Sequence, residues 1–438
     1  MPREYRREGK PIDNGNHTRP NVNSFDRSLR YCDRSGRPAP APRNLVRKDL
    51  GIEESFLLDD APRKALELFD LANYFRHYIS NVAPWYDLSD SQCCFSTEVP
   101  TIALDEPLLF FAVMALSAMV ISQTAAPSAR ATAEYYHTRC IRCLINLDSE
   151  DVLIKKGVAL AATCLLRSYE ILSESRDPNR HLKGAFSLAS QFQECLDRPP
   201  RGLLHSGFWN YLREDITFSL FGNCPLKIDL DPIPSLSNIS SDHDHLNAIS
   251  LVLGRIINAM IRSTAEDARN TWEVMWSYVK DWLSNLPAHF QSFSRAAVSS
   301  LSRLPTVHML KAFHAASRHY SLVSLAVLTI YAPTTMQVDE LALRASSMGF
   351  LVGTVTTRED LLEHIGLEIC GIAFTSNEPA VLVNAFGPIS YCAKYIRTEA
   401  TQQEVVRHLT ASRKATGWPI QQIILDLQRH WTAGSSVS

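Results

Sequence analysis

Apolar side chains recur every three or four residues along most of the chain after Pro62, and this spacing limits the chain to one class of fold. A helix has 3.6 residues per turn, so the spacing gathers apolar groups on one helical face. The last such segment carries five of them: Ile420, Ile423, Ile424, Leu427 and Trp431. Alternation with a period of two, typical of strands, is confined to residues 349–357. The sequence predicts an all-α protein, a large multi-helix bundle or irregular α-superhelix.

The predicted helices follow one another almost without interruption. The first begins near Pro62, and the others cover about 106–123, 128–147, 152–174, 181–196, 206–222, 243–263, 265–285, 305–331, 336–348, 358–375, 378–398, 402–413 and 419–431. Prolines at 225, 232 and 234 interrupt the pattern, because proline cannot continue a helix. We expect one helical domain over residues 61–432. Within it, residues 225–243 form either a hinge or a surface loop.

The first 60 residues have a different composition from the rest. Twelve Arg and Lys stand against six Asp and Glu in residues 1–50, whereas the remainder has 32 against 40. The segment is polar and proline-rich, and it cannot bury enough apolar surface to stay ordered. We expect a disordered basic arm at residues 1–60. It could contact DNA phosphates non-specifically, serve as a nuclear import signal, or be a solvated tail.

One run of the sequence is apolar enough to suggest a membrane. Residues 108–121 contain fourteen consecutive uncharged, mostly apolar residues, fewer than the roughly 20 that span a bilayer. We expect a buried core helix and no membrane contact. The N-terminal charges are not followed by an apolar stretch, so no secretory signal is predicted. Most of the ten cysteines lie in apolar helical patterns, which favours reduced, buried thiols.

Two clusters resemble metal sites by composition. The sequence SSDHDHLN places Asp242, His243, Asp244 and His245 together, but neighbours on a helix point about 100° apart, which favours a solvated helix start. Cys140 and Cys143 form a C-x-x-C pair without the second pair that a zinc site needs. Core packing is the favoured interpretation. We predict no metal and no cofactor.

The sequence also contains a group of histidines and a pair of tryptophans at helical spacing. His308, His314 and His319 lack the i, i+4 spacing of a helical metal site, which favours rim or surface positions. Trp272 and Trp276 fall on one helical stripe, which favours the core over a groove for an apolar effector. Neither a G-x-S-x-G motif, nor a phosphate-binding glycine loop, nor a D-D-x-x-D cluster occurs. The sequence predicts no enzyme and no catalytic residues.

Four sequence blocks together carry a resemblance to a known family. They are RHLKGAFSLA at 180–189, GFWNYLREDITFSLF at 207–221, EPAVLVNAFGPISYCAKYI at 378–396 and TGWPIQQIILDLQRHW at 416–431. Their order and separation resemble the fungal-specific transcription factor domain that accompanies zinc-cluster regulators, over roughly residues 60–432. The blocks supply ten candidate structural residues: His181, Gly184, Ala185, Trp209, Arg213, Asp215, Gly417, Trp418, Pro419 and Trp431.

Those residues also have an expected packing role. After His181, the small residues Gly184 and Ala185 would allow another helix to approach closely, and Trp209 would anchor its helix. Arg213 and Asp215 could form a charge pair, with a structural role favoured over ligand contact.

The resemblance implies a nuclear protein that controls transcription through its helical region. Regulators of this family often govern metabolic or secondary-metabolite genes. The implied partners are other transcription factors or the transcription machinery, with homodimers or heterodimers as alternatives. The six-cysteine zinc cluster is not found, because residues 1–92 contain one cysteine, Cys32. Sequence-specific DNA binding by this chain alone is therefore not expected, and DNA contact would be at most non-specific through the N-terminal arm, although a segment upstream of Met1 could carry the cluster. The alternative is a helical ligand-binding or enzymatic protein derived from the regulator fold.

Overall fold

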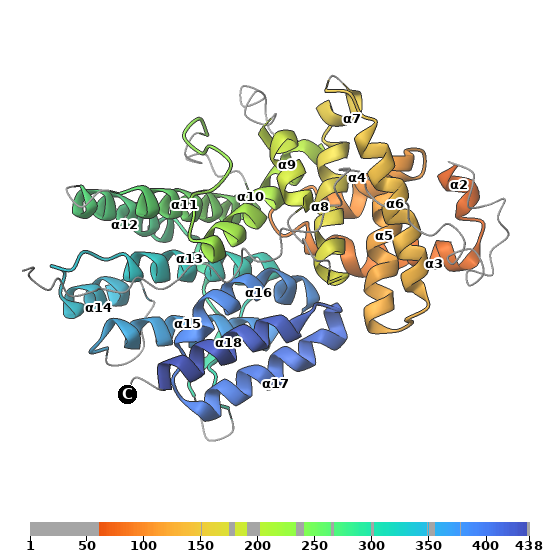
Figure 1. The fold of residues 1–438 in the computed structure, drawn as a ribbon. Coiled ribbons are helices and arrows are strands. Elements are labelled where there is room, and N and C mark those ends of the chain that lie inside the picture. Colours follow the sequence, from red (N-terminus) through yellow and green to blue (C-terminus); the bar gives the residue numbers. More distant parts are fainter. Residues whose placement is uncertain are drawn as a thin grey trace, which may run out of the picture. The chain divides into compact units, whose positions relative to one another are not determined.

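The computed structural model describes a succession of helices in the second of two units, Leu50–Ser438, into which the chain divides. The described residues are 61–149, 151–174, 180–190, 202–233, 241–263, 267–298, 302–347, 349, 355–376 and 378–435. The predicted arm at residues 1–60 lies outside them. Figure 1 shows the helices and their labels.

The first described segment bends through several short elements. It runs through α2 (Pro62–Ala65), α3 (Phe69–His77), a π turn at Tyr78–Val82 and a 3₁₀ turn at Ala83–Trp85. A loop then leads to α4 (Cys94–Ala103), a helix that the apolar spacing missed. Asp87 and Asp90 lie in that loop and accept hydrogen bonds from backbone N–H groups at its end. Hydrogen bonds to polar side chains therefore stabilise this segment, in which the apolar spacing of a helix is absent.

Helix α5 (Pro107–Thr124) is the apolar helix of the first half of this unit. It packs against α3, α4, α6 (Ala129–Ile145) and α8 (Val158–Leu172), and residues 108–120 are all buried. By length and composition α5 would also pass as a membrane span, with 72% of that window buried. The burial accounts for its apolar character, which confirms the predicted core helix.

A short helix, α7 (Val152–Lys155), precedes α8, and the two are separated by a turn rather than joined as predicted. Gly157 stands at this turn with a φ of 78°, in the left-handed region that favours glycine. A Cβ at this position would lie 2.2 Å from the backbone nitrogen of Leu204. Only glycine allows the chain to turn here against the backbone of Leu204, in the helix at Gly202–Gly222.

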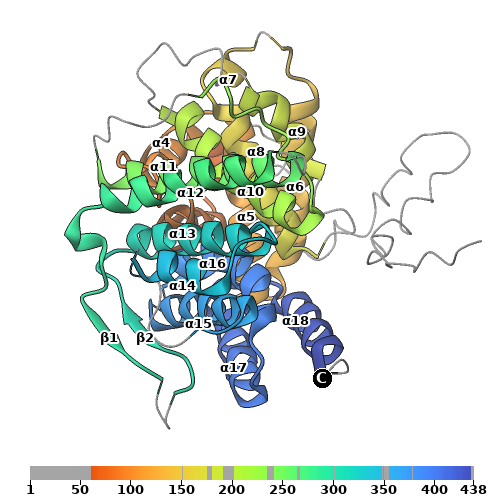
Figure 2. The same ribbon diagram turned by 90° about the vertical axis from the view of Figure 1, so that its left-hand side faces the viewer.

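The middle of the chain forms helices that lie side by side. These are α9 (Arg180–Ser190), α10 (Gly202–Gly222), α11 (Asp242–Arg262), α12 (Ala268–Ser284) and α13 (Ala312–Ile330). α11 packs against α10, α12 and α13, and Figure 2 shows α11, α12 and α13 stacked on one another. Trp272 of α12 is fully buried and donates a hydrogen bond to the Leu328 carbonyl at 2.8 Å. The tryptophan stripe thus belongs to the core, as the spacing favoured.

One prediction about this region is wrong. The helix expected at 305–331 starts only at Ala312, and the residues before it form a two-stranded antiparallel hairpin. Strand β1 (Ser294–Ala296) pairs with β2 (Thr306–His308), with Arg295 opposite Val307. Pro305 cannot donate the backbone N–H that a helix interior needs, whereas Val307 fills the gap against α15 in a strand. Figure 2 shows the hairpin beside the helices.

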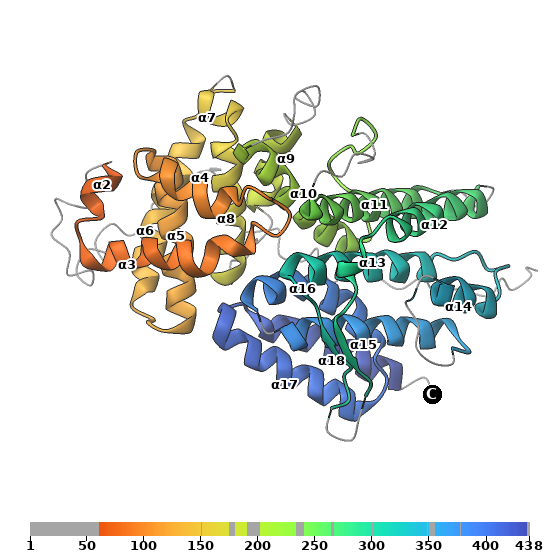
Figure 3. The same cartoon turned by 180° about the vertical axis from the view of Figure 1, so that it is seen from behind.

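The last part of the chain is again helical. It comprises α14 (Val338–Ser347), α15 (Arg358–Ser376), α16 (Pro379–Cys392), a 3₁₀ turn at Ala393–Tyr395, α17 (Glu399–Thr416) and α18 (Ile420–Ser435). α15 packs against α13 and α16, and α18 packs against α16 and α17, as Figure 3 shows from behind. The all-α prediction is confirmed for the described residues. Most of the alternating stretch at 349–357 lies outside them.

Candidate functional site

The candidate residues of the first block lie in α9. The backbone of His181 and Gly184 is helical, but their side chains lie outside the described part. Ala185 is buried, and α9 packs against α8 and α10. A small side chain therefore stands where α9 meets its neighbours.

Trp209 is the buried aromatic residue of α10. Its Nε1–H donates to the Nε2 of His205, one turn earlier, at 2.9 Å. Its ring lies edge-on to Phe208, with the centroids 5.2 Å apart. Burial lowers the pKa of His205, with smaller opposing effects from nearby carboxylates, and a neutral imidazole is the form that can accept this hydrogen bond.

Arg213 and Asp215 are both buried in α10, but they do not form the expected charge pair. Residues two positions apart on a helix point to different sides. Arg213 donates to the Ser89 hydroxyl at 2.7 Å and to Oδ1 of Asn210 at 2.8 Å. Burial lowers the pKa of Arg213. A guanidinium bonded to neutral groups thus ties α10 to the loop before α4.

The carboxylate of Asp215 serves a different segment. Its Oδ2 accepts the backbone N–H groups of Lys227 and Ile228 at 2.9 and 3.1 Å. Burial raises the pKa of Asp215, and these two hydrogen bonds act against that rise. Ile228, Leu230 and Ile233 are buried in this segment. The chain after α10 is therefore held to α10, and the predicted hinge at 225–243 stays a prediction.

The loop before α4 completes this buried polar network. Ser206 of α10 donates to Asp90, which also accepts the backbone N–H of Cys94 at 2.9 Å. Asn247 of α11 donates to the Ser89 carbonyl at 3.0 Å. Burial raises the pKa of Asp87 to about 6, against the hydrogen bonds that it accepts. The sequence does not single out this loop, because its Asp and Ser residues are typical of any turn.

The C-terminal block packs against α5 and the 83–85 turn. Gly417 ends α17 with a φ of 70°, and Trp418 lies edge-on to Trp85, with the centroids 6.5 Å apart. Pro419 directly precedes α18. Trp431 donates its Nε1–H to the Ala393 carbonyl at 3.1 Å. The stripe of the terminal helix thus has its partner inside the same chain.

The histidine predictions need correction. His308 is exposed on β2, but His314 and His319 are buried in α13. Their burial lowers the pKa of each imidazole to about 4. Their spacing favours surface positions only if a single face of α13 is covered. Neighbouring helices cover several of its faces, so His314 and His319 are buried.

His314 also lies near a residue of the acidic cluster. Oδ2 of Asp242, the first residue of α11, accepts a hydrogen bond from Nε2–H of His289 at 2.8 Å, and the ring centroids of His289 and His314 are 5.4 Å apart. His289 was not singled out from the sequence, because it lies far from both partners along the chain. Asp242, His289 and His314 are the one group of three potential metal ligands found among the described residues.

Comparison with protein families gives a match to part of the chain. Residues 73–205 match the model of the fungal specific transcription factor domain. This segment is similar to that family. The match confirms the predicted recognition over α3 to the first turn of α10, which is less than half of the chain. Comparisons with curated proteins and with solved structures return no match.

The matched segment contains one of the four blocks, residues 180–189, and ends just before the second begins. It also contains Ser89 and Asp90, whose hydrogen bonds reach Arg213 and Ser206 just beyond its end. The buried network therefore continues from the matched segment into the helices that follow. The domain and α10 are held together by polar contacts as well as by apolar packing.

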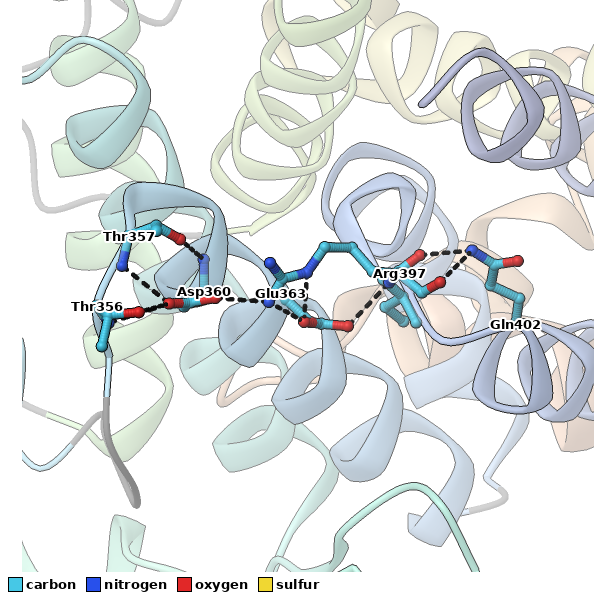
Figure 4. Close-up of polar contacts among 7 residues, drawn as sticks. Thr356, Thr357, Asp360, Glu363, Arg397 and Gln402 are labelled. Atoms are coloured by element: carbon cyan, nitrogen blue, oxygen red, sulfur yellow. Dashed lines mark hydrogen bonds and ion pairs between the residues drawn. The ribbon is translucent and has the colours of Figure 1, made fainter. Parts of the chain in front are cut away.

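A second polar cluster lies outside the matched segment (Figure 4). Asp360, at the start of α15, accepts the N–H and hydroxyl of Thr356 and the guanidinium of Arg397, which lies 2.6 Å away. Arg397 also donates to Glu363 at 2.8 Å. The hydroxyl of Thr356 and Arg397 hold the pKa of Asp360 well below its usual range. The cluster clamps α15 to the segment before α17 and faces solvent.

The described cysteines carry no disulfide. Cys140 is buried, but Cys143 is only half-buried, as are Cys93 and Cys224. Burial raises the pKa of Cys140 and of Cys143, so both are thiols at neutral pH and poor metal ligands. Core packing explains Cys140, as predicted, whereas the expectation of buried thiols is not met at Cys93, Cys143 and Cys224.

The described surface has shallow hollows. The better formed, beside Tyr331 and Tyr391, offers about 10 Å³ of space to water. Trp272 and Trp276 stack on each other in the core with centroids 5.0 Å apart, and Arg344 covers their rings. The groove for an apolar effector that the sequence left open at these residues is therefore filled by protein side chains.

Proposed function

We propose that this chain regulates transcription in a fungal nucleus through its all-helical region. The match of residues 73–205 to the fungal transcription factor domain carries the proposal, because it indicates a fungal transcriptional regulator. The domain's name describes a regulatory and not a catalytic family. An activity in addition to regulation is left to direct assay.

The chain would regulate transcription through contacts with other macromolecules. The partners would be other transcription factors or components of the transcription machinery, bound as a homodimer or heterodimer. The hydrogen bonds of the polar clusters around Arg213 and Arg397 join segments within the chain, so these two clusters serve the fold. We expect DNA contact by this chain alone to be at most non-specific, through the basic residues of the N-terminal arm.

The proposed targets are metabolic or secondary-metabolite genes. This part rests on what regulators of the family commonly control, and no residue of the chain identifies a promoter. It is tested separately from the regulatory role. Deletion of the gene should change the expression of such genes, and an unchanged transcript profile would remove this part alone.

Chromatin immunoprecipitation with the epitope-tagged full chain tests the regulatory role. We expect the chain in the nucleus and at a limited set of promoters. A matched pair of variants serves as the control: Gly349→Ala should keep the enrichment, and Gly157→Ala should lose it, because only the second places a Cβ against backbone. Absence of promoter enrichment for a folded, nuclear chain would contradict the proposal.

A further inference from the structure

Three segments that are distant in the sequence bring Asp242, His289 and His314 together. Asp242 begins α11, His289 is in the 3₁₀ turn at Ala288–Phe290, and His314 is in the first turn of α13. Each offers one potential ligand atom, and the three atoms all lie within 4.8 Å of one another. A carboxylate with two imidazoles is a donor set that divalent transition metals favour.

His314 provides the independent sign of a ligand. Its side chain is buried, with 1% of the residue exposed, yet neither Nδ1 nor Nε2 has a hydrogen-bond partner among the described residues. Buried polar atoms are nearly always paired, and each exception requires an explanation. The imidazole contacts the rings of Phe290 and Phe313, with centroid distances of 4.1 and 4.5 Å. These rings offer no hydrogen-bond partner to its nitrogens, and the potential metal ligands close to them are those of His289 and Asp242.

We propose that Asp242, His289 and His314 bind one divalent transition-metal ion, with Zn²⁺ the best fit to the ligand set. Two histidines and one carboxylate are a common zinc arrangement with one position left for water or another ligand. Tetrahedral bonds of about 2.0–2.1 Å place ligand atoms about 3.3 Å apart. The Asp242–His289 contact would therefore lengthen from 2.8 Å, and His314 would move closer.

The surroundings make this a reachable site of moderate affinity. The side chains of His289 and Asp242 are 45% and 43% exposed, so an ion can enter from solvent. Asp244 is also in the first turn of α11, but its carboxylate accepts the backbone N–H of Ser241 at 2.9 Å and caps the helix. Lys311 and the positive end of α11 act against a cation. We therefore expect weaker binding than at a four-ligand structural zinc site.

The ion would join three segments that packing already brings near. It would link the start of α11, the turn after α12 and the start of α13, so the bound form should resist unfolding more than the free form. This function goes beyond the proposed role in transcription, and the match to residues 73–205 does not include any of the three ligands. The site would make the stability of this end of α11 and α13 respond to available metal.

Titration of the full-length, EDTA-dialysed chain with Zn²⁺ tests the site by calorimetry and thermal unfolding. We expect one ion per chain at this site and a higher Tm with metal. His289→Gln and Asp242→Asn should each weaken binding by about tenfold or more. His308→Gln is the matched control, since His308 is an exposed histidine on β2, and it should bind as the wild type does.

Co²⁺ distinguishes this site from adventitious binding to cysteine. Ligation by nitrogen and oxygen gives visible d–d bands without the near-ultraviolet thiolate band that cysteine would produce. Loss of the d–d bands in His289→Gln would support the proposal. Equal Zn²⁺ affinity in the wild type and both ligand variants would overturn it, and so would a thiolate band as the only Co²⁺ signal.

Chemical modification provides a readout on the wild-type chain itself. Diethyl pyrocarbonate modifies accessible neutral imidazoles, and peptide mass spectrometry reports each histidine separately. Zn²⁺ should protect His289 and leave the rate at His308 unchanged. Equal modification of His289 with and without Zn²⁺ would overturn the proposal, even if the variants were to fold poorly.

Discussion

The guanidinium of Arg213 reaches the hydroxyl of Ser89, 124 residues earlier in the chain, at 2.7 Å. A second hydrogen bond joins Arg213 to Asn210, and Asn247 donates to the carbonyl of the same Ser89. Ser89 lies inside the segment that matches the fungal transcription factor domain, whereas Arg213 and Asn247 lie beyond it. One buried side chain thus connects the matched domain to the helices that follow.

Replacement of Arg213 should weaken this connection. Arg213→Met keeps an unbranched side chain but leaves the Ser89 hydroxyl and Oδ1 of Asn210 without their donor. We expect a loss of about 2 kcal/mol in the free energy of unfolding, measured by urea denaturation. Arg269→Ala, at an exposed position of α12, should change it by less than about 0.5 kcal/mol. Equal stability of the two variants would contradict the assigned role of Arg213.

Glycine substitutions should separate backbone strain from steric overlap. Gly349, Gly417 and Gly157 all have a φ between 70° and 78°. An added Cβ meets nothing within 4 Å at Gly349, a side-chain carbon of Gln123 at 3.0 Å at Gly417, and the backbone of Leu204 at 2.2 Å at Gly157. Alanine should cost about 1 kcal/mol at Gly349 from strain alone, more at Gly417, and most at Gly157. A different order of melting temperatures would show that these contacts do not govern stability.

Replacement of Trp431 should measure how firmly α18 is attached. Trp431→Phe loses the hydrogen bond to the Ala393 carbonyl and should cost about 1 kcal/mol, whereas Trp431→Ala also leaves a cavity and should cost about 3–5 kcal/mol. Leu425→Ala changes an exposed residue of the same helix, 39% accessible, and serves as the control. Hydrogen exchange of α18 amides should speed up in the order Leu425→Ala, Trp431→Phe, Trp431→Ala. Similar protection in all three would argue against attachment through Trp431.

Acid should destabilise the protein through His319. Its pKa is lowered by burial to about 4, against about 6.5 in an unfolded chain. Between these values the unfolded state binds a proton that the folded state does not, so this contribution is complete above pH 6.5 and is lost as the pH falls towards 4. The loss is at most about 1.4 kcal/mol per pH unit.

The variant His319→Gln isolates this contribution. Unfolding should be followed from pH 7 to pH 4.5 with EDTA present, so that metal bound near His314 has no effect. The stability difference between wild type and variant should shift in favour of the variant as the pH falls. A difference independent of pH would show that His319 does not titrate differently in the folded state.

The helical class follows from the sequence because apolar spacing records which side of each helix is covered. α5, α11 and α18 begin and end within a few residues of their predicted bounds. The hairpin escaped prediction because its strands are three residues long, too short to show a period. α4 was missed because its interior Pro100 resembles a helix terminator.

The sites were harder to predict than the helices. Arg213 and Asp215 were identified as structural candidates, but their partners Ser89 and Lys227 come from loops that carry no periodic signal. The sequence indicates Asp242 as part of a solvated helix start and His314 as a rim or surface histidine, with no sign that the two are close. Only the fold brings them next to His289, and no spacing along the chain could have indicated a group assembled from residues so far apart.

A tethering assay tests whether this chain regulates transcription. The full chain is fused to a bacterial DNA-binding domain in a fungal cell whose reporter promoter carries the matching operator. We expect the reporter output of the fusion to differ from that of the DNA-binding domain alone. This difference should be retained in Gly349→Ala and lost in Gly157→Ala. Output equal to that of the DNA-binding domain alone, from a wild-type fusion present in the nucleus at the same level, would contradict it.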